Sequence, residues 1–344
     1  MVTIKEIAGK LGIAISTVSK GLNGASDISD DLRQLILDTA VEMGYTTKKM
    51  RKEEHKKLCI LIENMEYEHP EDFGYDIVLG FRQMAMCENW SVTIVPVTPT
   101  LQAEEKFDSF ILRNGYSGAF ILGFALHDDW MKQIEKTITP TVLFDNYVLR
   151  NPNVAYIGTD SYEGIFLSVS HLVELGHKKI AFLNGSPNSM ITEHRCEAFL
   201  NSMAANKLSV EEGMNEFGYY VADCAKYHVP AFLEKGATAI LCASDLIALG
   251  VIRECRGMGY HVPEDISVIG FDDLPLAASL MPPLTTIRQD RVQLGKSGFA
   301  TLSGLLKHLP LSKTLLRAQL IERSTTAIAR ERSSALTSDM QDKL

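Results

Sequence analysis

The chain has 344 residues, of which 46% are hydrophobic and 22% are charged, and its formal net charge is −9. This length allows two or three domains, and the apolar content excludes a mainly disordered chain. No stretch approaches the roughly 18 uninterrupted apolar residues of a membrane-spanning helix, and the amino terminus has no export signal, so we expect a cytoplasmic protein. The six cysteines include no C-x-x-C pair and are expected to be reduced thiols.

The charge is distributed unevenly along the chain. Residues 1–57 carry ten Lys and Arg against eight Asp and Glu, whereas the remainder carries 24 against 35. An acidic protein does not bind nucleic acid over its whole surface, although a mildly basic head can bind it locally. The charge therefore permits nucleic-acid binding through the amino-terminal segment.

Three short helices are predicted within the first 45 residues. Thr3 and Glu6 form a capping box at the start of the first helix, a glycine then interrupts the apolar pattern, and a second helix begins near residues 14–16. Ser29 is expected to cap a third helix that ends at Gly44. The first two helices have the layout of a helix-turn-helix whose second helix fits a major groove, although a plain helical hairpin gives the same pattern.

The segment 46–57 is charged, lacks an apolar period and predicts a linker. Beyond it, short apolar runs alternate with helix-length segments, which indicates βαβ units around buried parallel sheets. Because roughly 290 residues are too many for one sheet, we expect two α/β lobes. The predicted strands are 58–62, 92–97, 119–122, 142–144, 180–183, 239–242 and 267–269.

The amino-terminal string TIKEIAGKLGIAISTVSKGLNG, followed by Ser29, Arg33 and MGY at 43–45, resembles the headpiece of the lactose-repressor (LacI/GalR) family. The resemblance implies a sequence-specific DNA-binding regulator in which Lys20, Ser16 and Ile15 read bases. Chemically, Lys20 can donate to guanine acceptors, and Ile15 can contact a thymine methyl group. The residues assigned to DNA contact are Thr3, Ile15, Ser16, Thr17, Ser19, Lys20, Asn23, Lys48, Lys49 and Arg51.

The resemblance breaks at the hinge. The family continues Y-x-P-N-x-x-A-x-x-L, a helix whose leucines wedge into the minor groove, but here Thr47 replaces the proline and Glu54 replaces the leucine. A glutamate cannot act as an apolar wedge beside phosphates. We therefore expect a solvated linker whose basic side chains attract phosphates diffusely; the alternative is a hinge that reads the operator centre.

Four stretches of the body, 154–164, 171–185, 240–275 and 282–290, are similar to the family's regulatory domain and occur in the same order. The resemblance implies two α/β lobes of the periplasmic-binding-protein type that close on a ligand, and a homodimer that places two headpieces on a pseudo-palindromic operator. The predicted boundaries are 1–46 for the headpiece, 47–57 for the hinge, 58–158 with 289–318 for lobe 1, 159–288 with 319–330 for lobe 2, and 331–344 for a tail too short for a tetramerising coiled coil.

An effector pocket is expected where strands end at the crevice between the lobes. Asp145 and Asp272 end predicted strands and Arg195 is expected to open a helix; two carboxylates and a planar guanidinium suit a polyol. Aromatic candidates would stack on a sugar's apolar face, although those of the acidic loop EYEHPEDFGYD have core packing as the alternative. The residues assigned to the effector are Phe73, Tyr75, Asp145, Arg195, Tyr220, Ser244 and Asp272, with Ser244 standing where many relatives of the family carry a sugar-contacting Asn.

Other polar residues have structural interpretations. Asp245 and Asp273 are expected to fix turns and helix starts, and Asp160 is either a turn residue or a pocket residue. His171 and His177 have no neighbouring ligands, so we expect no metal site and no cofactor.

Two other classes of protein compete with a regulator. A sugar-active enzyme on this fold would use Asp145 and Asp272, but the chain has no G-x-G-x-x-G, P-loop or G-x-S-x-G motif, and we expect no catalytic residue. A transport receptor would share the two lobes but would need an export signal. The sequence therefore predicts a ligand-responsive repressor of carbohydrate-utilisation genes, controlled by a small sugar-like effector, with corepression as the alternative sign.

Overall fold

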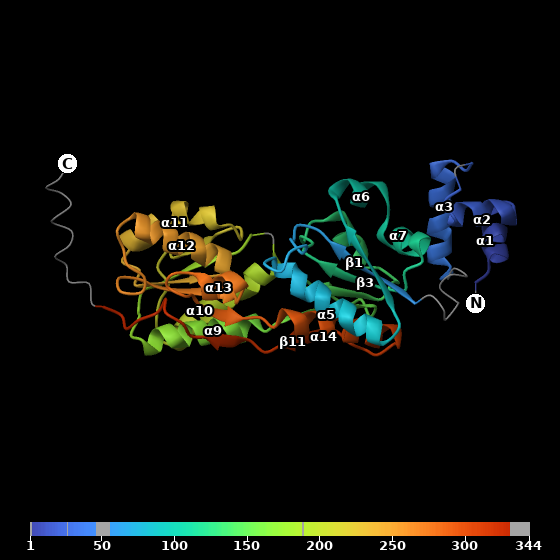
Figure 1. The fold of residues 1–344 in the computed structure, drawn as a ribbon. Helices are drawn as coiled ribbons and strands as arrows, with labels where there is room; N and C mark the ends of the chain where they lie inside the picture. Colours follow the sequence, from blue (N-terminus) through green and yellow to red (C-terminus); the bar gives the residue numbers. More distant parts are fainter. Residues whose placement is uncertain (1, 26, 46–55, 188, 331–344) are drawn as a thin grey trace. The chain divides into compact units, whose positions relative to one another are not determined.

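The computed structural model of the chain describes residues 2–25, 27–45, 56–187 and 189–330 (Figure 1). The chain divides into two compact units: unit 1 comprises Met1–Thr159, Asn188–Met190 and Asp290–Leu316, and unit 2 comprises Asp160–Pro187, Ile191–Gln289 and Arg317–Leu344. Both units are therefore assembled from segments that lie far apart in the sequence.

The first three helices of unit 1 form the headpiece, and they confirm the expected elements: α1 (Ile4–Leu11), α2 (Ile15–Leu22) and α3 (Asp30–Glu42). The capping box of Thr3 and Glu6 is present, and Ser29 caps α3 by accepting from the Leu32 amide. Gly12 makes the turn after α1 with a left-handed φ of 67°. The apolar faces of the three helices meet at the fully buried side chains Ile7, Val18 and Ile36.

A six-stranded sheet, parallel throughout, forms the centre of unit 1, in the order β11-β5-β4-β3-β1-β2. Its strands are β1 (Lys57–Ile62), β2 (Ser91–Pro96), β3 (Ala119–Leu122), β4 (Thr141–Phe144), β5 (Val154–Thr159) and β11 (Lys313–Leu316). Its helices are α5 (Phe73–Cys87), α6 (Pro99–Glu104), α7 (Phe107–Asn114), α8 (Asp129–Ile134) and α14 (Arg291–Leu306).

Helices α5 and α14 pack side by side on one face of this sheet (Figure 1). Phe81 of α5 stacks on Phe120 with ring centroids 4.9 Å apart and meets Phe299 of α14 edge-on at 5.7 Å. The two helices approach so closely that a Cβ added to Gly295 would lie 2.0 Å from the Ile77 carbonyl oxygen. A second apolar cluster in unit 1 is centred on the fully buried Trp130.

A second six-stranded sheet forms the centre of unit 2, in the order β12-β10-β9-β8-β6-β7, with only the β10–β12 pair antiparallel. Its strands are β6 (Ile180–Asn184), β7 (Asn215–Phe217), β8 (Ala239–Cys242), β9 (Ser267–Asp272), β10 (Thr285–Arg288) and β12 (Gln319–Ile321). Its helices are α9 (Ser161–Glu174), α10 (Met190–Ala205), the 3₁₀ turn η2 (Ala222–Cys224), α11 (Ala225–Glu234), α12 (Asp245–Gly257) and α13 (Pro275–Ser279). Helices α11 and α12 cover one face and α9 and α10 the other (Figure 1), around one continuous apolar core.

The strand predictions are confirmed in part. All seven expected strands are present, and β3 and β8 have the expected ends. The apolar run predicted for β9 stopped at Ile269, whereas the strand ends at Asp272, the residue expected to end it; the prediction omitted β5, β7, β10, β11 and β12.

Three predicted DNA contacts, Lys48, Lys49 and Arg51, lie outside the described residues, as do residues 47–55 of the expected hinge and the tail at 331–344. Lys57, expected to end the hinge, is instead the first residue of β1. Within the described ranges, no helix has the length and apolar content that a bilayer crossing requires.

Candidate DNA-binding and effector-binding sites

Helix α2 presents a polar, exposed face. Ile15 is 52% exposed although it is a large apolar residue, and Ser16 and Lys20 are exposed on the same side, while Val18 points into the core. Lys20 lies in the last turn and forms an ion pair through Nζ with Asp27, on the loop before α3. An exposed lysine, a serine hydroxyl and an apolar tip supply the chemistry that reads base edges in a major groove.

The other predicted DNA residues surround this face. Thr17 and Ser19 are half-buried. The Asn23 side chain donates to the Ser19 carbonyl oxygen at 2.7 Å, which ties down the end of α2. Thr3 is exposed, but its hydroxyl group exchanges hydrogen bonds with Glu6 in the capping box. Thr3 and Asn23 therefore each have a local structural role.

The carboxyl edge of the unit 2 sheet is built around Arg195. Its side chain is 2% exposed, its guanidinium lies 3.8 Å over the Phe271 ring, and its Nη1 donates to the Ala243 carbonyl oxygen at 2.8 Å. The expectation that Arg195 opens a helix is wrong, because α10 begins at Met190. The aromatic ring compensates for part of the cost of burying a cation.

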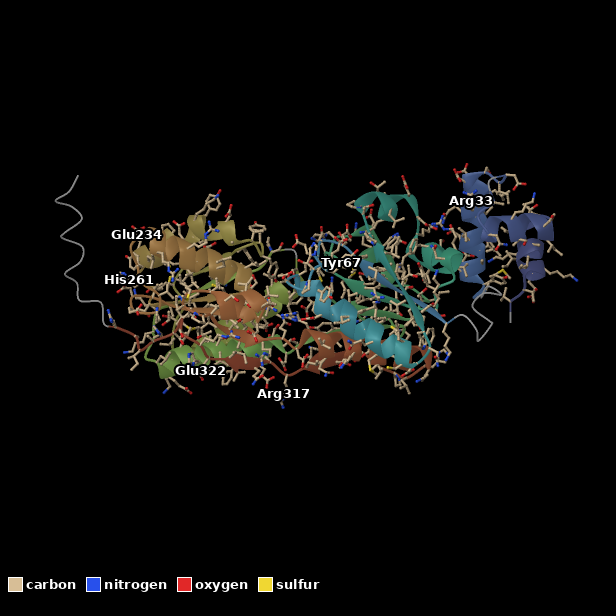
Figure 2. The ribbon with its side chains drawn as sticks, in the orientation of Figure 1. Arg33, Tyr67, Glu234, His261, Arg317 and Glu322 are labelled. Atoms are coloured by element: carbon tan, nitrogen blue, oxygen red, sulfur yellow. The ribbon has the colours of Figure 1, made fainter. Side chains whose placement is uncertain are left out.

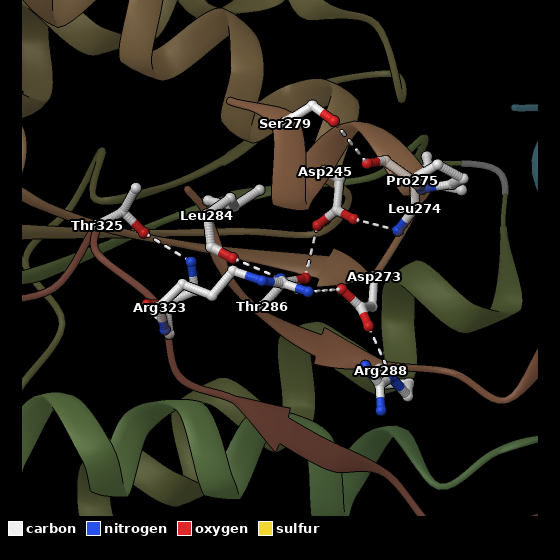
Figure 3. A network of polar contacts seen from close by, with 11 residues as sticks. Asp245, Asp273, Leu274, Pro275, Ser279, Leu284, Thr286, Arg288, Arg323 and Thr325 are labelled. Atoms are coloured by element: carbon white, nitrogen blue, oxygen red, sulfur yellow. Dashed lines mark hydrogen bonds and ion pairs between the residues drawn. The ribbon is translucent and has the colours of Figure 1, made fainter. Parts of the chain in front are cut away.

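The turn that follows β9 is strained and held by several contacts. Asp272 and Asp273 have left-handed φ values of 115° and 53°, a conformation that costs of order 1–3 kcal/mol per residue and persists only when the surroundings enforce it. The Gln289 side chain donates to Asp272 Oδ1 at 2.7 Å. Asp273 accepts from Arg288 and Arg323, each at 2.6 Å (Figure 3), so both carboxylates are oriented by side chains at or just beyond the ends of β10 and β12.

Asp245 holds this turn through hydrogen bonds, as expected for a residue that fixes a turn and a helix start. It is fully buried, accepts from the Leu274 amide at 2.7 Å and from the Thr286 hydroxyl group at 2.6 Å, and is the first residue of α12 (Figure 3). Burial, and next the nearby Asp272 carboxylate, raise the pKa of Asp245 well above its usual range. Asp160 likewise caps α9 by accepting from the Glu163 amide.

Tyr220 lies on the same edge of unit 2, where it covers Gly185. A Cβ added to Gly185 would lie 2.2 Å from the tyrosine ring, and the Tyr220 hydroxyl group contacts Thr192 Oγ1 at 3.2 Å. Tyr220 also has a left-handed φ of 58°, which a bulky residue adopts rarely. Ser244 is buried and caps α12 by accepting from the Ile247 amide, so its oxygen is already used as an acceptor.

The carboxyl edge of the unit 1 sheet carries the remaining predicted effector residues. Asp145 directly follows β4 and has a left-handed φ of 52°. Phe73 and Tyr75 were expected in a loop, but they lie in the first turn of α5. The Phe73 ring packs on Phe144 with centroids 6.0 Å apart, so part of this side chain belongs to the core.

Sequence reasoning missed three residues at these surfaces: Asp27, Glu63 and Gln289. Glu63 directly follows β1, is buried, and accepts from the Gln102 side chain. Burial, and next the nearby Asp128 carboxylate, raise the pKa of Glu63 to about 7. The only signal for Glu63 was a polar residue directly after an apolar run, and Gln289 and Asp27 had none.

The two histidines singled out in the sequence hold the carboxyl-terminal segment of unit 2. His177 is buried and contacts Thr238, Ser267 and the Ala327 carbonyl oxygen, and His171 contacts Thr326. Across the described ranges, no cluster of three or more His, Cys, Asp or Glu residues has the arrangement of a metal site.

A helix-turn-helix head with an exposed recognition face, followed by two doubly wound α/β units with polar carboxyl edges, defines the class of two-lobed, ligand-binding DNA regulators. Residues 3–48 match the model described as bacterial regulatory proteins, lacI family, and residues 169–326 match the periplasmic binding protein-like domain.

Individual proteins match over nearly the whole chain. The regulator reg1 of Streptomyces lividans is 27% identical over 95% of this chain and 97% of its own, and the ribose operon repressor of Haemophilus influenzae is 23% identical over 90% and 93%. The solved lac repressor dimer, bound to operator and the anti-inducer ONPF, is 25% identical, with a TM-score of 0.66 over 95% of this chain and 99% of that chain. The chain therefore carries a DNA-binding domain of the lacI family and a periplasmic binding protein-like domain, and it is a DNA-binding transcription regulator.

Proposed function

We propose that the protein is a cytoplasmic, homodimeric repressor of carbohydrate-utilisation genes, which binds its operator through α2 and releases it when a small, uncharged sugar binds at the carboxyl edge of the unit 2 sheet. The observation that carries the effector proposal is the buried Arg195 guanidinium on the same edge as the Asp272 carboxylate. A fork of donors and a carboxylate acceptor together satisfy the hydroxyl groups of a polyol.

The remaining effector contacts follow from the same chemistry. Tyr220 offers an aromatic surface for the apolar face of a sugar ring, and Ser244 acts as a donor because its oxygen already accepts from the helix. Phe73, Tyr75 and Asp145, at the corresponding edge of unit 1, stay predicted contacts. No catalytic step is part of the proposal, since Asp272 and Asp273 are engaged in hydrogen bonds and the relatives above are named as regulators.

In the DNA-binding step, Ile15, Ser16 and Lys20 read base edges, which their exposure on one face of α2 supports. The residues proposed to contact phosphates are Thr3, Thr17, Ser19 and Asn23, with Lys48, Lys49 and Arg51 adding diffuse attraction. The related lac repressor binds operator as a dimer, and two copies of α2 in one dimer would read two half-sites. Binding of the effector then lowers the affinity for the operator, and binding of the operator lowers the affinity for the effector, through a coupling free energy of typically about 1–3 kcal/mol.

Thermal unfolding tests the effector site. The full-length protein is heated with ribose, glucose, cellobiose, glucose 6-phosphate and uridine, as wild type, as Asp272→Asn and as the control Glu264→Gln. Asparagine tolerates the left-handed φ at position 272, and Glu264 is exposed on the loop before β9, at the opposite edge of the sheet. We expect one neutral sugar to raise the unfolding midpoint of wild type and Glu264→Gln but not of Asp272→Asn.

Other results of this unfolding test would change the effector proposal. A shift by uridine alone would show that the carbohydrate assignment is wrong. A shift that persists in Asp272→Asn would place the effector elsewhere. The active sugar is then added to protein bound to its selected DNA, and tighter binding in place of release would establish corepression.

A further inference from the structure

The ion pair between Lys20 and Asp27 lies on the exposed side of α2. Lys20 Nζ contacts a carboxylate oxygen of Asp27, and the two side chains are 52% and 57% exposed. Exposed pairs of this kind contribute little to folding stability. The hydrogen bond from Lys20 lowers the pKa of Asp27, so the carboxylate is ionised at neutral pH. A negative charge is thus fixed beside the lysine proposed to read DNA.

Arg33 of α3, which is labelled in Figure 2, holds the backbone around Asp27 in place. Arg33 Nη2 donates to the Ala25 carbonyl oxygen at 2.9 Å and to the Ile28 carbonyl oxygen at 3.3 Å, so one guanidinium joins the residues on both sides of Asp27. Ile28 is buried in the headpiece core. The position of Asp27 is therefore set by the loop and not by the ion pair alone.

We propose that Lys20 and Asp27 together read one G·C base pair, which makes Asp27 a specificity-determining residue of the headpiece. The inference rests on the proposed placement of α2 in the major groove. There, guanine presents the acceptors N7 and O6, and its paired cytosine presents the N4 amino donor next to O6. Lys20 donates to guanine and to Asp27, and Asp27 accepts from cytosine N4. Every contact among the two side chains and the two bases therefore joins a donor to an acceptor.

The same arrangement rejects other base pairs. In the reversed C·G pair, the Asp27 carboxylate faces guanine O6 and Lys20 faces the cytosine amino group, so both contacts are repulsive. A T·A pair offers an acceptor and a donor in the right order, but a thymine methyl group replaces guanine N7 and Lys20 loses one acceptor. On DNA that lacks this base pair, the Asp27 carboxylate offsets the positive charge of Lys20 and is itself repelled by the phosphates. Asp27 therefore lowers general DNA affinity and raises selectivity.

The test uses full-length protein and DNA duplexes that wild type enriches from a random pool. Dissociation constants are measured on the enriched duplex, on a set with each base pair of the half-site replaced in turn, and on unrelated DNA. The variants are Asp27→Asn, Asp27→Ser and Lys20→Met, and the control is Asp31→Asn, which removes an exposed headpiece charge in the first turn of α3.

We expect both Asp27 variants to lose about tenfold of the preference for G·C over C·G at one position of each half-site. They should also bind unrelated DNA a few times more tightly. Asp31→Asn should leave the base preference unchanged. The combined variant Lys20→Met with Asp27→Asn should lose no more preference than Lys20→Met alone, because both residues serve one base pair.

Three results would overturn the proposal. If Asp27→Asn keeps the wild-type preference while Lys20→Met loses it, Lys20 reads the base alone. If Asp31→Asn changes the preference as much as Asp27→Asn does, the effect is general electrostatics. If wild type enriches no sequence at all, the proposed DNA role of α2 fails as well. Far-UV circular dichroism of each variant checks that the chain is folded.

Discussion

The close contact between α5 and α14 makes the substitution Gly295→Ala a sensitive test of the packing of unit 1. The added Cβ would lie 2.0 Å from the Ile77 carbonyl oxygen and 2.7 Å from the Phe81 amide nitrogen, whereas ordinary contacts begin at 3.4 Å. Because both neighbours are backbone atoms, the helices must move apart, and this loosens the contact of Phe81 with Phe299. Overpacking of this kind costs up to about 3 kcal/mol, and alanine recovers about 1 kcal/mol through its helix propensity.

The expected result is a net loss of about 2 kcal/mol in the unfolding free energy of unit 1, or roughly 4–8 °C in its midpoint. Tryptophan fluorescence measures this unit selectively, because both tryptophans, Trp90 and Trp130, belong to it. The control Gly9→Ala, at a position in α1 with no atom within 4 Å of the added Cβ, should stabilise the headpiece by roughly 0.5–1 kcal/mol. An unchanged or raised midpoint for Gly295→Ala would refute the packing argument.

Two further predictions concern unit 2. Burial lowers the pKa of His177 from its ordinary 6.5, so the stability that the neutral ring contributes is present above pH 6.5 and is lost as the pH falls toward the folded-state value. His177→Gln should therefore flatten the decline in unfolding free energy between pH 7 and 5, measured by urea titration; an equally steep decline in this variant would refute the argument. Gly185→Ala should push the Tyr220 ring off the sheet edge, at a cost of about 1 kcal/mol in unfolding free energy. It should also remove the rise in unfolding midpoint that the effector causes. Both effects are measured by thermal unfolding at increasing effector concentration, with Tyr220→Phe as the comparison variant.

Strands buried on both faces were the easiest elements to predict from the sequence. β3 (AFIL) and β8 (AILC) consist entirely of buried apolar residues, so local composition determines both ends. β11 and β12 are short and partly exposed, and their strand conformation comes from pairing with β5 and β10, far away in the sequence. β9 continues past its apolar run to Asp272 because its neighbour β10 pairs with Gly270, Phe271 and Asp272.

The candidate sites were predictable in outline only. Asp145 and Asp272 were placed at strand ends because a polar residue after an apolar run marks the carboxyl edge of a parallel sheet. The contacts that orient them were not visible, since Gln289 reaches Asp272 only after β10 has paired with β9. Phe73 was misplaced because the acidic segment before it hides the start of α5.

The interleaved construction of the two units affects the order in which parts of the protein become complete during synthesis. The three helices of the headpiece are encoded by one continuous stretch that ends by residue 45. Unit 1 needs β11 at its edge, and unit 2 needs Thr325, which donates to the Val268 carbonyl oxygen and accepts from the Thr285 amide. Domains form as their segments emerge from the ribosome. A translation product that stops before β11 therefore contains every headpiece helix but neither finished unit, and such a fragment would be a DNA-binding head without its means of control.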